Sequence, residues 1–151
     1  GAMGIDVAYH RDDEAIGLHA MLAHLGQPIV RHLQDLAWQG WPEEQVAERG
    51  RIMWKTLLDD AAQGANMVMG VARLRKGDSL EPHRHAEPET YFALGGRGIV
   101  TVEGVEHVIE AGTMVFIPGN ARHQIVNVDD EELQLLYVFA AGEFQKIVYR
   151  F

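Results

Sequence analysis

The sequence predicts an all-β domain, an antiparallel sandwich or a small barrel, with a helical segment in front of it. From Arg51 onward, short apolar runs are separated by turn residues, which is typical of antiparallel strands. Before Gly50 the apolar residues recur instead at helical spacing. With 151 residues and 47% apolar side chains, the chain has the size and composition of one folded domain.

Three short helices are expected before the barrel. The first begins near Asp12 and ends at Gly26, and its apolar residues stand at i, i+3, i+4 and i+7, namely Leu18, Met21, Leu22 and Leu25. Pro28 suits the first position of a second helix, which ends at Gly40. A third helix is expected to begin near Pro42 and to end at Gly50.

We therefore expect a single domain with three parts. Residues 1–4 look like the remnant of a cleaved purification tag. Residues 5–50 form a helical cover, because short amphipathic helices need a surface to bury against. Residues 51–151 form the barrel, since no linker, repeat or low-complexity segment divides them.

Eight or nine strands are expected in the barrel. They lie near residues 52–58, 67–74, 90–94, 98–102, 105–109, 114–117, 123–128 and 133–139, with 146–149 as the ninth. The dipeptide Glu103-Gly104 stands between two alternating strands and predicts a tight hairpin. Strands of this number and spacing favour an antiparallel sandwich or a small barrel.

Composition restricts the partners and the chemistry. Acidic side chains outnumber basic ones by 22 to 13, and the formal net charge is −9, which disfavours nucleic acid and anionic membranes as partners. No apolar run is long enough for a membrane span, and no signal segment follows the first residues, so a cytoplasmic protein is expected. Cysteine is absent, so a transition-metal site would use imidazole and carboxylate ligands.

One group of residues has the spacing of metal ligands. His83 and His85 stand two residues apart, on the same face of an extended segment, and Glu89 follows four residues later. His123 comes after the turn Pro118-Gly119-Asn120 on another strand. Three neutral imidazoles and one carboxylate can bind a divalent metal and leave positions open for water or substrate.

The spacing around these residues resembles that of the cupin superfamily. Gly77, His83-x-His85, Glu89 and Gly96 match the first cupin motif, and Gly112, Pro118, His123 and Asn127 resemble the second. One departure is Asn120, where cupins usually have glycine, but asparagine tolerates left-handed backbone. The resemblance covers residues 66–140. It implies a double-stranded β-helix, or jelly-roll barrel, one bound metal held by His83, His85, Glu89 and His123, and a homodimer.

Tyr91 is the candidate for acid–base chemistry. It stands two residues after Glu89, so alternation directs both side chains to the interior. A phenol beside a metal can coordinate it or act as a base, although many aromatic residues at such positions only pack. The series His-x-His-x3-Glu-x-Tyr is also similar to that of the cupin dimethylsulfoniopropionate lyases, a resemblance that implies proton removal by Tyr91.

Four further residues are candidates for substrate contacts. Lys55 and Arg73 lie within apolar strands and could hold a substrate carboxylate inside the barrel. His107 alternates with Val105 and Ile109 and could face the interior as well. Tyr137 is expected in an apolar wall together with Met67, Met69, Met114 and Phe116.

Three functions remain open at this point. The first is a metal-dependent lyase or isomerase for a small polar compound, in which the metal polarises the substrate and Tyr91 moves a proton. The second is an Fe(II) dioxygenase, and the third is a binding module without catalysis. The ligand set suits iron, manganese, nickel, zinc or copper.

Overall fold

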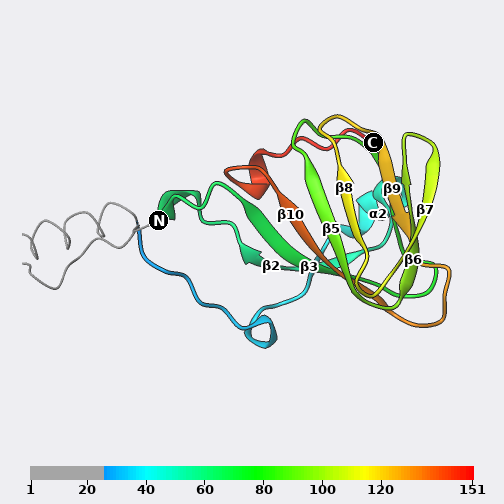
Figure 1. The fold of residues 1–151 in the computed structure, drawn as a ribbon, viewed down its shortest axis with the longest axis horizontal. Helices are drawn as coiled ribbons and strands as arrows, with labels where there is room; N and C mark the ends of the chain where they lie inside the picture. The colour runs from blue at the N-terminus through cyan, green and yellow to red at the C-terminus, as the bar shows by residue number, and fades with distance from the viewer. Residues whose placement is uncertain (1–25) are drawn as a thin grey trace, which may run out of the picture. The chain divides into compact units, whose positions relative to one another are not determined.

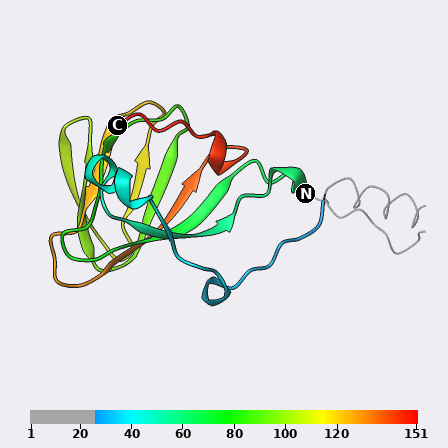
Figure 2. The same cartoon turned by 180° about the vertical axis from the view of Figure 1, so that it is seen from behind.

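The computed structural model describes residues 26–151, and all of its strands lie within the compact unit Arg31–Phe151. Ten strands form two antiparallel sheets (Figures 1 and 2). They are β1 (Gln39–Gly40), β2 (Met53–Leu58), β3 (Val68–Leu74), β4 (Ser79–His83), β5 (Glu89–Gly95), β6 (Arg97–Val102), β7 (Val105–Glu110), β8 (Met114–Ile117), β9 (His123–Val126) and β10 (Leu133–Phe139). The all-β prediction is thereby confirmed.

The strand order is that of a jelly-roll barrel. One sheet has the order β1-β2-β3-β10-β5-β8, and the other has the order β4-β9-β6-β7. Early and late strands therefore alternate, because β3 pairs with β10 and β4 pairs with β9. Glu103 and Gly104 both have positive φ between β6 and β7, which confirms the predicted hairpin.

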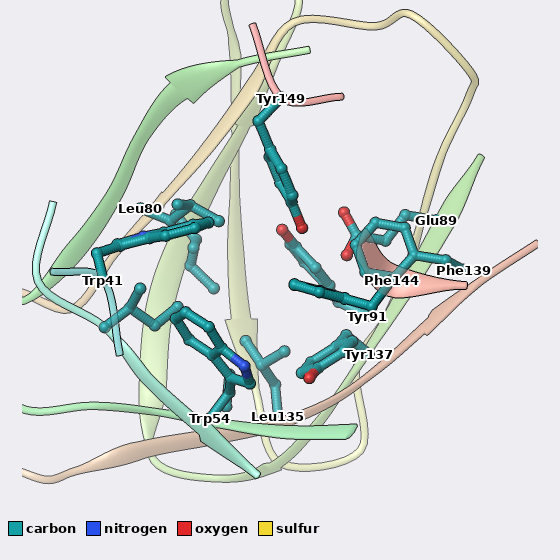
Figure 3. Close-up of a pocket in the computed structure, with 13 residues that line it drawn as sticks. Trp41, Trp54, Leu80, Glu89, Tyr91, Leu135, Tyr137, Phe139, Phe144 and Tyr149 are labelled. Atoms are coloured by element: carbon teal, nitrogen blue, oxygen red, sulfur yellow. The ribbon is translucent and has the colours of Figure 1, made fainter. Parts of the chain in front are cut away.

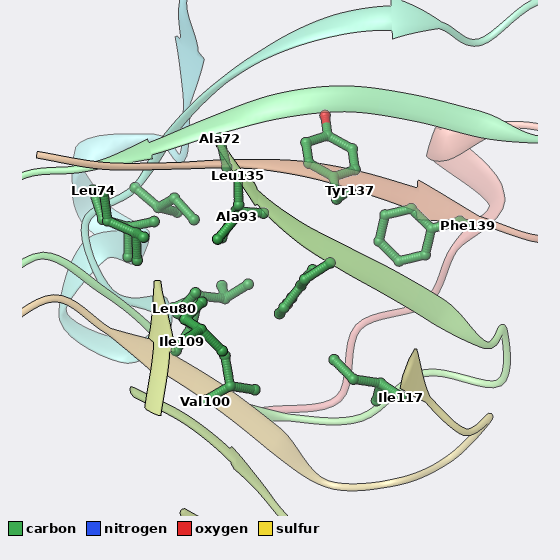
Figure 4. Close-up of a cluster of buried hydrophobic side chains, with 14 of the residues drawn as sticks. Ala72, Leu74, Leu80, Ala93, Val100, Ile109, Ile117, Leu135, Tyr137 and Phe139 are labelled. Carbon is green, nitrogen blue, oxygen red and sulfur yellow. The ribbon is translucent and has the colours of Figure 1, made fainter. Parts of the chain in front are cut away.

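The core fills the space between the two sheets (Figure 4). Burial alternates along β10, where every second side chain from Leu133 to Phe139 is buried. Ala72, Ala93, Val100, Ile109 and Ile117 meet these residues from the other strands. The alternation fixes which side chains point into the barrel, and so it fixes the composition of the site.

The helical prediction is correct for only one of the two described segments. The helix expected after Pro28 is absent, and only the 3-10 turn η1 (Leu33–Asp35) forms. The third helix is confirmed as η2 (Glu43–Gln45) followed by α2 (Val46–Arg49). Gly50 ends α2 with a φ of 93°, and a Cβ there would collide with the Ser79 carbonyl on β4. The helix predicted over residues 12–26 lies largely outside the described residues.

The strands also differ from the prediction in three places. β1 and β4 were not expected, because β1 has only two residues and β4 carries Glu81 and Pro82. The strand expected over 146–149 is replaced by the 3-10 turn η4 (Phe144–Lys146) and one bridge between Arg84 and Arg150. η3 (Ala61–Gln63) is a further short turn. The helical cover over 5–50 as part of one domain stays a prediction.

None of the helices within residues 26–151 has the length and apolar composition that crossing a bilayer would need.

Candidate metal centre and its pocket

Three histidines meet on the inner side of the four-stranded sheet. His83 ends β4 and His123 begins β9, and the two residues are direct partners across the strand pair. His85 follows two residues after His83, so it faces the same side. The ligand nitrogens of the three rings lie within 4.8 Å of one another, and all three side chains are buried. Pairing of two strands therefore brings together residues forty positions apart in the sequence.

The backbone sets the tautomer of each ring. The Nδ1 atoms of His83, His85 and His123 each lie 2.8 Å from a carbonyl oxygen two residues away. A carbonyl oxygen only accepts, so each Nδ1 carries the proton and each Nε2 presents its lone pair to the centre. The Nε2 atoms of His83 and His85 are buried without a hydrogen-bond partner among residues 26–151. Burying such acceptors costs folding free energy unless a cation occupies the space between them.

Glu89 supplies a carboxylate from the opposite sheet. It begins β5, and its Oε1 lies 3.2 Å from His123 Nε2 and 3.4 Å from His85 Nε2. With the protons on Nδ1, both the Nε2 atoms and the Glu89 oxygen are acceptors. They can lie this close only if a metal ion or a proton is shared between them. The four side chains thus have the donor types and the directions that a divalent transition metal requires.

The pKa shifts agree with this arrangement. Burial, helped by the neighbouring imidazoles, lowers the pKa of His83 to about 3, so this ring is a neutral ligand near neutrality. Burial alone would raise the pKa of Glu89, but His123 and His85 outweigh it and lower that pKa. Burial would likewise lower the pKa of His85, but Glu89 raises it. The carboxylate is therefore ionised and available as a ligand.

A narrow cavity of about 40 Å³ lies beside Glu89 (Figure 3). Most of its lining is aromatic, and the lining comprises Trp41, Ile52, Trp54, Ala72, Leu80, Glu89, Tyr91, Ile125, Leu135, Tyr137, Phe139, Phe144 and Tyr149. Glu89 is the one carboxylate among these residues, and no lysine or arginine of residues 26–151 lines the cavity. A cavity of this size holds a few water molecules and suits only a small ligand.

Tyr91 and Tyr137 both line this cavity, as alternation predicts. They are direct partners across β5 and β10, and both are buried. Burial, followed by the charge of Glu89, raises the pKa of Tyr91 well above its usual range. The Tyr137 hydroxyl is buried without a hydrogen-bond partner in the described protein. It lies against Gly70, where any Cβ would collide with it.

Lys55 and Arg73 do not enter the barrel. Their side chains lie on the outer face of the six-stranded sheet, where both stack on Trp38, with Lys55 Nζ at 4.8 Å and Arg73 Cζ at 4.2 Å from its ring centroid. Lys55 also donates to the Leu33 carbonyl, and Arg73 pairs with Glu132 at 3.6 Å. The prediction that they hold a substrate carboxylate inside is therefore wrong. Alternation places their neighbours Trp54 and Ala72 inside instead.

Four other predicted interior residues lie on the surface, and one of them is Met67, which precedes β3 and is 42% exposed. His107 is exposed on β7, because β7 is the edge of its sheet and only Ile109 reaches the core. Met114 and Phe116 are also exposed, at 58% and 57%, on the outer face of the edge strand β8. Of the predicted apolar wall, Tyr137 alone lines the cavity.

Sequence reasoning missed several lining residues. Trp41 and Trp54 meet edge to face at 5.0 Å and close one side of the cavity, although neither was among the candidate site residues. Phe144 and Tyr149 come from the C-terminal segment, which was expected to add a strand but no site residue. The alternation of aromatic residues in Tyr149-Arg150-Phe151 is the signal that could have indicated them.

Known proteins resemble this chain in sequence and in fold. The family model of the cupin domain matches residues 70–139. Dimethylsulfoniopropionate lyase DddW of Ruegeria pomeroyi is 45% identical over 103 residues, which cover 68% of this chain and 67% of that protein. Acireductone dioxygenase of Bacillus thuringiensis is 30% identical over 66 residues, 40% of this chain and 39% of that enzyme.

A solved structure supports the fold independently. The crystal structure of a predicted oxalate decarboxylase from Thermotoga maritima superposes with a TM-score of 0.67 at 23% identity. The match covers 75% of this chain and 99% of that one. The motif spacing, the interleaved barrel and these matches agree, and the chain belongs to the cupin superfamily.

Proposed function

We propose that the protein is a metal-dependent lyase that eliminates a leaving group from a small carboxylate, as a dimethylsulfoniopropionate lyase does. The observation that carries the proposal is the meeting of Tyr91 with the three-histidine, one-carboxylate centre. Glu89 and Tyr91 stand two residues apart on β5 and line the same narrow cavity. The identity of 45% with a lyase of this name supports the same reaction class.

The metal would be held by His83, His85, Glu89 and His123. When bound, it would polarise the substrate carboxylate and offset the effect of the Glu89 charge on Tyr91. The aromatic lining excludes bulk water from the remaining space and orients a small substrate beside Tyr91.

Tyr91 is proposed as the base. Its phenolate oxygen takes the proton from the carbon next to the carboxylate, and that electron pair forms the new double bond. The bond to the leaving group breaks, and its electron pair departs with that group. For dimethylsulfoniopropionate the balance is one acrylate, one dimethyl sulfide and one proton, with no oxidant needed. Tyr91 then returns its proton to water.

Fe(II) dioxygenase chemistry is the second candidate. The same four ligands suit iron, and the local similarity to acireductone dioxygenase supports this alternative. The two candidates differ in their need for oxygen. For a dioxygenase, iron held by these four residues would supply the chemistry with oxygen, and Tyr91 would have a lesser role.

An assay under air and under nitrogen distinguishes the two candidates. Protein loaded separately with iron, manganese, nickel, zinc or copper is incubated with dimethylsulfoniopropionate, and the released dimethyl sulfide is measured by gas chromatography. The lyase proposal expects equal release under both gases and no oxygen uptake. Release that requires air, or no release with any of the five metals, would contradict the proposal.

We also propose that the protein forms a homodimer through the outer face beside β8. Phe92, Leu94, Met114 and Phe116 are exposed there, and Phe92 and Met114 are cross-strand partners. None of these side chains is charged. Two copies of a chain whose net charge is −9 can therefore meet at this patch without bringing like charges together. Phe116→Glu should convert the dimer to a monomer in light scattering. Val108→Glu, an equally exposed apolar site on β7, is the control.

A further inference from the structure

The C-terminal segment pairs with the stretch that carries two of the ligand histidines. Arg84 and Arg150 exchange two backbone hydrogen bonds of 2.9 Å across an antiparallel bridge. Antiparallel register places Phe151 opposite His83 and Tyr149 opposite His85, on the same side of the pair. The ring distances agree: His83 lies 5.2 Å from Phe151, and His85 lies 5.3 Å from Tyr149. His-Arg-His therefore faces Tyr-Arg-Phe.

The Tyr149 ring is fixed by aromatic neighbours. It stacks on Phe151 at 6.0 Å and meets the edge of Trp41 at 5.6 Å. Phe151 is in turn covered by the Arg49 guanidinium, 4.9 Å from its centroid. Val148, the preceding residue, points outward and is 63% exposed. The segment thus directs Tyr149 inward and its neighbour outward.

The hydroxyl of Tyr149 points into the cavity that Tyr91 and Glu89 line (Figure 3). Within the described part of the chain, no lysine or arginine lines this cavity, and Lys55 and Arg73 lie on the outer face. A substrate carboxylate must therefore be bound by the metal and by neutral hydrogen-bond donors. Tyr149 is such a donor, and it stands next to two of the proposed metal ligands.

We propose that Tyr149 is a substrate-binding residue that donates a hydrogen bond to the substrate carboxylate, beside the metal. The assignment rests on the proposed function only for the identity of the carboxylate. Tyr149 and Tyr91 then have different roles. Tyr149 binds the substrate carboxylate, and Tyr91 removes the proton from the neighbouring carbon. The C-terminal segment becomes part of the binding site, because it positions this hydroxyl.

The test measures binding of propionate, which has the carboxylate but no leaving group. Isothermal titration calorimetry compares metal-loaded wild type with Tyr149→Phe, which removes the hydroxyl and keeps the ring. One hydrogen bond to a charged group corresponds to a loss of affinity of about tenfold or more. Val148→Ala on the same segment is the matched control and should bind propionate as wild type does. Metal content and thermal melting should be unchanged in both variants.

A second variant separates hydrogen bonding from packing. Phe151→Leu disturbs the ring that supports Tyr149 but keeps its hydroxyl, so a packing role predicts that it weakens propionate binding as much as Tyr149→Phe does. Equal losses in the two variants would overturn the proposal, as would wild-type affinity in Tyr149→Phe or no propionate binding by wild type. With dimethylsulfoniopropionate, Tyr149→Phe should raise KM about tenfold and change kcat less than Tyr91→Phe does. If wild type releases no dimethyl sulfide, the lyase proposal fails, but propionate binding still decides the role of Tyr149.

Discussion

The two faces of strands β2 and β3 carry different kinds of polar and aromatic residues. On the inner face, Trp54 and Ala72 line the cavity, and Gly70 makes room for the Tyr137 hydroxyl. On the outer face, Lys55 and Arg73 stack on Trp38 and attach the segment around Leu33 to the sheet. A step of one residue along either strand moves from the site to a structural contact. The face of the sheet on which a polar side chain lies must therefore be known before a role in the site is assigned to it.

The largest effect is expected at the candidate metal ligands on the inner side of the barrel. His123→Ala removes one imidazole from the four proposed ligands, so stoichiometric metal should be lost while the barrel stays folded. Mass spectrometry measures the metal content, and circular dichroism checks that the barrel stays folded. His107→Ala changes an exposed histidine outside the site and should keep its metal. Equal metal content in wild type and His123→Ala would show that the assignment is wrong.

The next largest effect is expected at Tyr91. Tyr91→Phe keeps the buried ring and removes the proposed base, so turnover of dimethylsulfoniopropionate should fall by at least about a hundredfold. Metal content should not change, because Tyr91 is not among the proposed ligands. Steady-state kinetics on matched metal-loaded samples measure the ratio. Near-normal turnover would remove Tyr91 as base and favour the dioxygenase.

A smaller effect, on stability, is expected at Gly70 on the inner face. Gly70→Ala places a Cβ against the Tyr137 hydroxyl and the Lys55 carbonyl, and the backbone oxygen cannot move freely. Overpacking of this kind costs about 1–3 kcal/mol of unfolding free energy. Urea denaturation compares it with Gly142→Ala, where a Cβ meets nothing within 4 Å. If both variants are as stable as wild type, the contact with Tyr137 is not a constraint.

The smallest effect is expected on the outer face. Lys55→Met and Arg73→Met remove the cations above Trp38, each contact being worth about 0.5–1 kcal/mol at a partly exposed site. Neither side chain lines the cavity, so kcat/KM should stay within about twofold of wild type. A tenfold loss of activity in either variant would show that the residue contributes to the site. The outer face would then not be purely structural.

Much of this candidate site could be predicted from sequence, because residues that could share one metal ion stand at fixed spacing along the strands. His83, His85, Glu89 and His123 came from short-range patterns, and the structure brings all four side chains together. Lys55 could not be placed, because β2 has apolar residues on both faces where the segment around Trp38 covers it, and alternation disappears. Tyr149 could not be placed either, since its contact with His85 spans most of the barrel sequence and only the fold reveals it.

The pairing of β3 with β10 has a consequence for how the chain assembles. Val68 on β3 pairs with Phe139 on β10, and Leu80 on β4 pairs with Ile125 on β9, so each residue has its partner far along the chain. A growing chain therefore cannot complete the four-stranded sheet before β9 has been synthesised, nor the six-stranded sheet before β10, and its early apolar strands stay uncovered until then. The histidines at positions 83 and 123 meet only when β9 pairs with β4, so the candidate metal centre cannot form before that pairing.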